Sequence, residues 1–390
     1  MPLRPVLCLA LLLLAGCNHD PIASDVEAVK GADAPGRKAA ALRLAGLRDP
    51  RIAPVLVRAL RDPDHDVRCA AAQALGQQDP ADAVEPLVSL LATRGLGYEC
   101  AFAPLGQLKD ARAAAPLIAA ATGNDSDQAL ATLAALGPGA MPALINGLRK
   151  EPDPHRAEAI AKALIAAGGK AVLPALLELN KEYDRTANAN AVLALGLLGD
   201  AQALPALVAA ADKGIGSAPL ALARLGAPGI DNLVVRIGSP RPWQRDLAIA
   251  ALAQARDPAI VPALGQGMKS PTPAVADASA RLLAQLAGIG TPTPGMAVDA
   301  ALKASALAAL QRAAAGGDTR ALAATLDHYL DQADGEDQLI DLMEMHGDER
   351  LAAAFIASGS ERLRAAAGEW SRQTGKRPCA NPPECEPVVT

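Results

Sequence analysis

Side chains of the types that bind metal ions are concentrated in the stretch LRDPDHDVRCAAAQALGQQDP, residues 60–80. Four of them fall within five positions and a cysteine follows shortly after: Asp62, Asp64, His65, Asp66 and Cys69. Carboxylate oxygens bind hard cations such as Ca²⁺, whereas imidazole nitrogen and thiolate sulfur bind Zn²⁺. Whether this stretch is a metal site or a structural feature depends on the elements that carry it.

The three aspartates have the spacing of the first ligands in a calcium-binding EF-hand loop. That loop needs glycine and glutamate at two later positions, where this sequence has Val67 and Gln73. Each aspartate has a structural role instead. Because a residue before proline disfavours helix, a first helix is expected to stop at Asp62. Asp64 is the expected N-cap of a second helix, and Asp66 lies in its first turn, where a carboxylate favours the helix dipole.

We expect no metal, cofactor or catalytic residue elsewhere either. His65 is expected to face solvent at the helix start. In residues 327–349 four side chains could converge on a metal if two helices pack antiparallel, namely His328, Asp331, Glu344 and His346, but a solvated acidic face is the commoner explanation. The sequence has no Gly-x-x-x-x-Gly-Lys phosphate loop, no His-Glu-x-x-His, no Cys-x-x-Cys and no Gly-x-Ser-x-Gly. We therefore do not expect this protein to be an enzyme.

Two short amphipathic helices flank the aspartates. Apolar residues recur at helical spacing in both, with one stripe at Ile52, Val55, Leu56, Ala59 and Leu60 and the other at Val67, Ala70, Ala71, Ala74 and Leu75. Isolated helices of about ten residues are marginal in water. These two must therefore gain their stability by packing on neighbouring helices.

The neighbours are expected to be repeats of the same pair. Leu-Gly, interpreted as the end of a helix, recurs along the chain, and the glycines are spaced by 30, 31, 31, 28 and 30 residues: Gly76, Gly106, Gly137, Gly168, Gly196 and Gly226. Apolar residues make up 51% of the chain but aromatic residues only 2%, so the core must consist of Ala, Leu and Val. Regular spacing with such a core predicts an all-α repeat array.

The repeat resembles the short HEAT-like repeats of bacterial proteins, the type also found in phycobilisome lyases. The resemblance rests on Asp49-Pro50, Pro54, Asp62, Val67-Arg68 and Leu75-Gly76, with Arg245 and Val275 in register further along. It covers residues 36–288, about eight units, and is weaker near 95–130 and 212–245. It implies an armadillo-type superhelix, a right-handed α-solenoid of helical hairpins.

The glycines and prolines of GIGTPTPG, residues 288–295, indicate a boundary after the repeats. Residues 296–374 are expected to form non-repeating helices that cap the solenoid. Residues 375–390 are expected to be a disordered tail.

The N-terminus MPLRPVLCLALLLLAGC has one positive charge and an apolar stretch too short to span a bilayer, which is typical of a secretion signal. Leu14-Ala15-Gly16-Cys17 resembles the lipobox of bacterial lipoproteins, which implies cleavage of residues 1–16 and lipidation of Cys17. An ordinary signal with a chance cysteine is the alternative. Asn18 points to the outer membrane, facing the periplasm. Residues 17–35 are expected to be a polar tether, and we expect no other transmembrane segment.

Export favours disulfides. In the tail, Cys379 and Cys385 are interpreted as a small disulfide loop, with free thiols as the alternative. Cys69 and Cys100 lie about one repeat apart. A disulfide between repeats and two buried small side chains explain them equally well.

The leading functional hypothesis is a non-catalytic scaffold that binds a protein or peptide partner on the concave face of the solenoid. Nucleic acid is not expected, because the formal net charge is −5, no basic run is present and aromatic residues are scarce. The segment SPRPWQRD, residues 239–246, offers Trp243 flanked by Arg241 and Arg245, and Trp and Arg are enriched in binding hot spots. Alternatively, Trp243 fills a gap between repeats.

Two other functions are compatible with the same features. One is an immunity lipoprotein that neutralises a periplasmic toxin. The other is an enzyme related to the HEAT-repeat lyases, which rests on fold analogy alone.

Overall fold

The computed structural model describes residues 20–379 except 32, 122–124, 290 and 297, and every regular element in that part of the chain is a helix. The chain divides after Asn190 into two compact units. The fold is a solenoid of helical hairpins.

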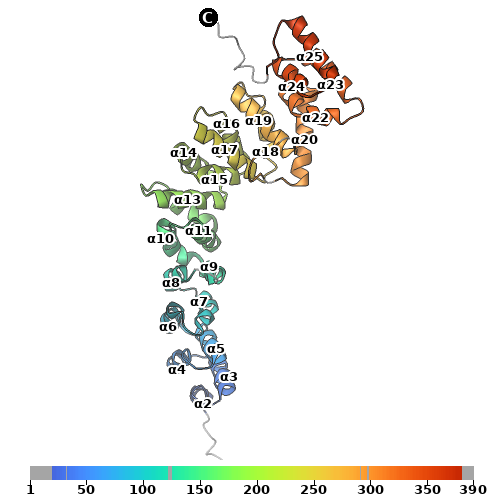
Figure 1. Ribbon diagram of the computed structural model, residues 1–390. Coiled ribbons are helices and arrows are strands. Elements are labelled where there is room, and N and C mark those ends of the chain that lie inside the picture. Colours follow the sequence, from blue (N-terminus) through green and yellow to red (C-terminus); the bar gives the residue numbers. More distant parts are fainter. Residues whose placement is uncertain (1–19, 32, 122–124, 290, 297, 380–390) are drawn as a thin grey trace, which may run out of the picture. The chain divides into compact units, whose positions relative to one another are not determined.

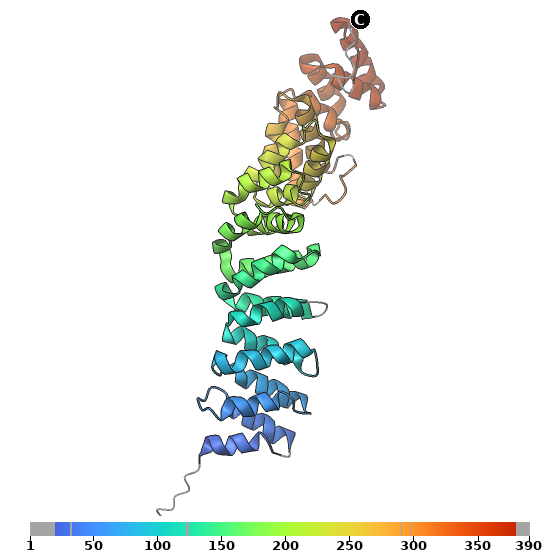
Figure 2. The ribbon, with the colours of Figure 1, turned by 90° about the vertical axis from the view of Figure 1, so that its left-hand side faces the viewer.

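In the first unit each hairpin packs on the next, so that the helices form successive layers (Figures 1 and 2). Helices α3, α5, α7, α9 and α11 contact one another in one row, and α2, α4, α6, α8, α10 and α12 form the other. The helices are α2 (Pro21–Ala28), α3 (Ala34–Leu44), α4 (Ile52–Ala59), α5 (His65–Leu75), α6 (Pro80–Thr93), α7 (Phe102–Leu108), α8 (Ala114–Ala120), α9 (Ser126–Ala135), α10 (Met141–Lys150), α11 (Pro154–Gly168) and α12 (Leu173–Leu179). Short 3-10 turns lead into several of them: η1 (Tyr98–Ala101), η2 (Ala111–Ala113), η4 (Gly137–Ala140) and η5 (Gly169–Val172).

The predicted helix pair around the aspartates is present as α4 and α5. All ten residues of the two predicted stripes are buried. Asp64 is the N-cap of α5, and its carboxylate accepts a hydrogen bond from the Val67 N–H at 3.1 Å. The first helix ends at Ala59, slightly earlier than Asp62. Burial of these stripes between layers supplies the stability that helices of this length lack alone.

The recurring glycine does not always end a helix, which corrects the sequence interpretation. Gly196 lies inside α13 (Arg185–Leu198), and a Cβ added there would be only 2.5 Å from the Cβ of Ala221 in the next hairpin. Gly106 similarly lies inside α7 and packs on α9. At Gly106 and Gly196 the missing side chain therefore allows successive helices to approach closely. Gly226 instead lies in a turn, where its φ of +71° favours glycine.

The expected tether is structured from Asp20 onward, because α2 occupies part of residues 17–35. Asp20 caps this helix by accepting from the N–H groups of Ile22 and Ala23. Asp25 pairs with Arg43 of α3 at 2.8 Å. The folded repeats therefore begin before residue 36.

In the second unit the hairpins continue from the end of α13 and lead into further helices. These are α14 (Leu204–Asp212), α15 (Ala218–Arg224), α16 (Ala227–Arg236), α17 (Pro242–Gln254), α18 (Ile260–Gly267), α19 (Pro273–Leu286), α20 (Ala300–Ala315), α21 (Thr319–Ala324), α22 (Leu326–Leu330), α23 (Gly335–His346), α24 (Glu349–Ala357) and α25 (Glu361–Thr374), with η6 (Ala201–Ala203) before α14. Helix α20 buries Leu302, Ala306 and Leu310 and contacts α18 and α19. It thereby covers the apolar side of the last repeat.

One stretch, Pro154–Leu179, is long and apolar enough to cross a membrane by composition, although the sequence led us to expect none beyond the N-terminal signal. Two further helical segments, Ser126–Ala135 and Gly137–Lys150, are long and apolar enough only when they are taken together, and the chain bends by 117° between them. The first stretch is interrupted at Gly169, where φ is +54°, and comprises α11, η5 and α12. Ile160 and Leu164 of α11 are buried in the repeat core, which accounts for the apolar composition.

Candidate functional site

The three aspartates at the start of α5 make structural contacts. The Arg37 Nε and Nη2 atoms each donate to the Asp62 carboxylate at 2.8 Å, and this hydrogen bonding lowers the pKa of Asp62. Lys38 donates to Asp66 at 2.8 Å, while Asp64 caps the helix. Two of the carboxylates are thus paired with cationic side chains of α3. This arrangement agrees with the expected structural role of the aspartates.

Cys69 and Cys100 are joined by a disulfide between α5 and η1. His65 lies beside it, with Nε2 at 3.7 Å from the Cys69 Sγ and 4.0 Å from the Cys100 Sγ. The same Nε2 lies 2.8 Å from Glu99 Oε1, and the hydrogen bond to Glu99 raises the pKa of His65. His65 is exposed, as expected, but it is held by a partner from the next hairpin.

His65, Cys69 and Cys100 are close enough together to hold a metal ion. Zinc binds cysteine as thiolate, so both sulfurs are blocked while they form the disulfide. Reduction would be needed before the cluster could act as a ligand set. Sequence reasoning missed this grouping. Its signal was the spacing of four between His65 and Cys69, combined with a second cysteine one repeat later.

The other predicted metal set does not assemble among the described residues. The His328 Nε2 lies 2.9 Å from the Gln311 Nε2, which gives this imidazole a hydrogen-bond partner on α20. His346 lies against Gly317. Asp331 and Glu344 join neither histidine in a group close enough to hold a metal.

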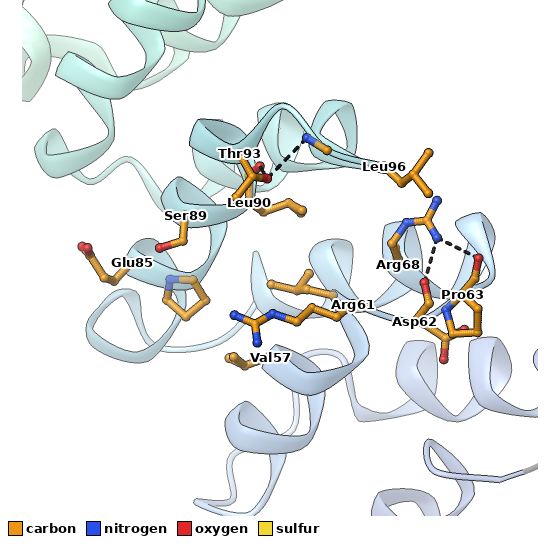
Figure 3. A pocket seen from close by; sticks show the side chains of 13 residues that line it. Val57, Arg61, Asp62, Pro63, Arg68, Glu85, Ser89, Leu90, Thr93 and Leu96 are labelled. Carbon is orange, nitrogen blue, oxygen red and sulfur yellow. Dashed lines mark hydrogen bonds between the residues drawn. The ribbon is translucent and has the colours of Figure 1, made fainter.

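A pocket of about 650 Å³ lies between α4 and α6 (Figure 3). The turn at residues 61–63 and the loop at residues 95–96 complete its walls. Apolar side chains of Val57, Leu60, Pro86 and Leu90 line it together with Ser89 and Thr93, and Leu96 at its edge is 81% exposed. Leu96 therefore adds exposed apolar surface to the rim of the pocket.

Arg68 lines this pocket and is only 5% exposed. Its Nη1 donates to the backbone carbonyls of Asp62 and Pro63 at 2.7 and 2.9 Å. The buried Nε has no hydrogen-bond partner, and among the described residues Arg68 forms no ion pair. Burying a guanidinium without an ion-pair partner costs free energy, so Arg68 is a candidate to bind an anion.

A second guanidinium faces the same pocket. Arg61 is exposed, and in the described part of the chain its guanidinium makes neither a hydrogen bond nor an ion pair. The two acidic residues in the lining differ in whether they form an ion pair. Asp62 is paired with Arg37, whereas Glu85 is exposed on α6. The lining thus holds two arginines and two acidic residues, and because Asp62 is paired with Arg37, Glu85 is the remaining acidic residue facing the two guanidiniums.

The candidate contact residues on α17 lie in the second unit. Trp243 is the second residue of the helix and is 41% exposed, and its ring edge lies over Gly214. Arg241 is the N-cap residue without a side-chain cap hydrogen bond, and Arg245 lies 3.9 Å from Asp246. Trp243 thus both covers a neighbouring turn and presents surface to solvent.

Of the remaining predicted residues, Cys379 is disulfide-bonded and only 6% exposed. Its N–H donates to the Glu349 carbonyl at 2.7 Å, so the beginning of the expected tail is docked on α24. Cys17 and Cys385 lie outside the described residues.

Comparison with known proteins identifies HEAT repeats at residues 26–95 and 141–223. No curated protein matches the sequence. An engineered protein of known structure is similar over 92% of this chain and 100% of its own, with 19% identity and a TM-score of 0.31. The structure of Kap95p with RanGDP is similar over 92% of this chain and 54% of its own, with 14% identity and a TM-score of 0.37. Kap121p is similar over 90% of this chain and 56% of its own, with 11% identity and a TM-score of 0.32. The two segments matched by the family model are HEAT repeats, which are typical of protein-interaction scaffolds.

Proposed function

We propose that this protein is a non-catalytic scaffold, anchored by a lipid on Cys17, that binds a protein or peptide partner in the bacterial cell envelope. The observation that carries the proposal is the buried, unpaired guanidinium of Arg68 in an open pocket whose edge is the exposed Leu96. A buried charge without an ion-pair partner is unfavourable in the free protein. A partner that supplies an anion would offset this cost, and its apolar side chains could pack on Leu96.

The location rests on the N-terminal sequence. The lipobox-like Leu14-Ala15-Gly16-Cys17 supports a lipid anchor, and Asn18 supports the outer membrane. The Cys69–Cys100 disulfide fits an oxidising compartment such as the periplasm. Buried acyl carbons contribute about 0.8 kcal/mol each, so acylation with more than one chain would hold the protein stably at the membrane.

The test is crosslinking in living cells with the native anchor, followed by purification and mass spectrometry. We expect one envelope protein to be recovered reproducibly with the wild type. Cys17→Ser, the matched control for the anchor, should move the protein from the membrane fraction to the soluble fraction. Failure to recover any protein partner across growth conditions would contradict the scaffold function, and Cys17→Ser remaining in the membrane would contradict the anchor.

The same experiment distinguishes the immunity function. The formal net charge of −5 favours a basic partner, as a toxin can be. Nanomolar affinity for a single secreted protein would identify an immunity protein, whereas a scaffold is expected to bind an envelope component with more modest affinity.

A further inference from the structure

We propose that the pocket between α4 and α6 binds an acidic, apolar peptide segment of the partner, with one carboxylate at Arg68 and a second at Arg61. The proposal rests on the proposed function and names the chemistry of the partner. It follows from the charges, the shape and the apolar edge of this pocket.

The anionic part of the ligand follows from Arg68. Only its Nη1 has acceptors among the described residues, and these are neutral carbonyl oxygens of the turn. The guanidinium lies between this turn and Leu96 (Figure 3). Gly97 covers Nε, because a Cβ added at Gly97 would be 2.6 Å from that atom. A ligand therefore reaches Arg68 from the pocket side, where Nη2 is available to donate.

Charge complementarity favours a ligand with carboxylate groups and limits how many of them the pocket can accept. Among the described residues neither Arg61 nor Arg68 forms an ion pair, while Asp62 is paired with Arg37. Glu85 on the opposite wall repels a strongly acidic segment. Two acidic residues, with neutral or basic residues toward Glu85, fit this distribution.

The apolar part of the ligand follows from the walls. Leu90 and Val57 are half-buried in the lining, and the Leu96 side chain is largely exposed next to Arg68. An apolar side chain adjacent to an acidic residue would cover Leu96 while the carboxylate reaches Arg68. A small inorganic anion would leave these walls uncovered, which is why a peptide segment is the better occupant.

A displayed library of random peptides, selected on the full-length protein in detergent, tests this. We expect selected sequences enriched in Asp or Glu next to Leu, Ile, Val or Phe. Synthetic versions should bind Arg61→Gln about three- to fivefold more weakly than wild type, as expected for an exposed ion pair. Arg58→Gln, on the preceding helix α4 but outside the lining, should bind as wild type does. Each acidic residue of the peptide is then replaced in turn by its amide. Replacing the one that pairs with Arg61 should weaken binding to wild type but not to Arg61→Gln, whereas replacing the one that pairs with Arg68 should weaken binding to both proteins.

Selection of no peptide, selection without acidic enrichment, or equal binding to Arg61→Gln and wild type would each overturn the inference. Arg68→Gln is the less useful variant, because loss of the Nη1 contacts with the turn can unfold the repeat. The cell crosslinking experiment separates the two proposals. If Arg61→Gln retains the crosslinked partner, this pocket is not its binding site and the scaffold function stands. If wild type captures no partner, the scaffold function itself fails.

Discussion

Arg37 and Asp62 are 25 residues apart in the sequence, yet two hydrogen bonds of 2.8 Å join the guanidinium of the first to the carboxylate of the second. The Asp62 carboxylate also accepts from the Asp64 N–H at 2.9 Å. One side chain therefore ties the turn between α4 and α5 to the preceding helix α3. Asp62, one of the aspartates that first suggested metal chemistry, thus connects neighbouring repeats.

Replacement of Asp62 by asparagine should destabilise the first unit. Loss of the charged hydrogen bonds is expected to lower the free energy of unfolding by about 2 kcal/mol. Asp66→Asn is the matched control, because the pair between Asp66 and Lys38 is exposed and should matter little. Urea unfolding at neutral pH measures both. Equal effects of the two substitutions would contradict a special role for Asp62.

The same residue predicts a pH dependence. The pKa of Asp62 is lowered in the folded protein by the hydrogen bonds from Arg37, so the unfolded state binds the proton more readily. Its contribution to stability is therefore present above the unfolded pKa, about 3.9, and is lost as the pH falls through the folded pKa. The difference in unfolding free energy between wild type and Asp62→Asn should shrink below about pH 4. A difference that stays constant down to pH 2 would show that the ionised carboxylate is not responsible.

The disulfide between Cys69 and Cys100 should stabilise the first unit. It closes a loop across a sequence separation of 31, for which chain entropy gives about 3 to 4 kcal/mol. The double variant Cys69→Ser with Cys100→Ser should lose stability of this order in urea unfolding. Both proteins should carry Cys379→Ser, so that a reductant acts on this disulfide alone. Reductant should then destabilise the parent and leave the double variant unchanged.

Gly97 should tolerate no side chain. Its φ is +84°, and a Cβ would lie 2.6 Å from the Arg68 Nε, so Gly97→Ala strains the backbone and displaces the guanidinium. A loss of about 1 to 2 kcal/mol is expected for the backbone alone. Gly95→Ala in the same loop is the control, since the nearest side-chain atom there is 3.5 Å away. Thermal unfolding that shows the two variants to be equally stable would contradict this account of the loop.

Trp243 should be dispensable for folding and needed for binding if it is a partner contact. The chain has two tryptophans, and Trp370 is only 9% exposed. Acrylamide should therefore quench Trp243 fluorescence in a Trp370→Phe protein more strongly than it quenches Trp370 in Trp243→Ala. A folded Trp243→Ala that loses its crosslinked partner supports the contact. Unfolding of Trp243→Ala would show that the ring instead fills the space over Gly214.

The local part of the fold could be predicted from the sequence. Apolar spacing identified the buried residues of α4 and α5, and the position after Pro63 identified Asp64 as the cap, because both signals depend on residues within one or two turns. Helix α2 carried a similar signal in Asp20 and Pro21, which the polar composition of the segment obscured.

Features that depend on contacts between repeats could not be predicted in the same way. Gly196 packs against Ala221, 25 residues away, so its role could not be distinguished from a helix end by local pattern. The pocket was missed for a related reason. Arg68 matched the repeat pattern, but the lack of an acceptor for its Nε depends on every neighbour in space rather than on its own sequence.

The disulfide also determines how the first unit would respond to force. A pull along the backbone would pass from Cys69 directly to Cys100, because the covalent bond is the shorter path. The intervening residues, which include all of α6, would be removed from the line of tension. The α6 wall of the pocket would then keep its shape while other parts of the chain were stretched, as would happen if the proposed lipid anchor and a bound partner pulled in opposite directions.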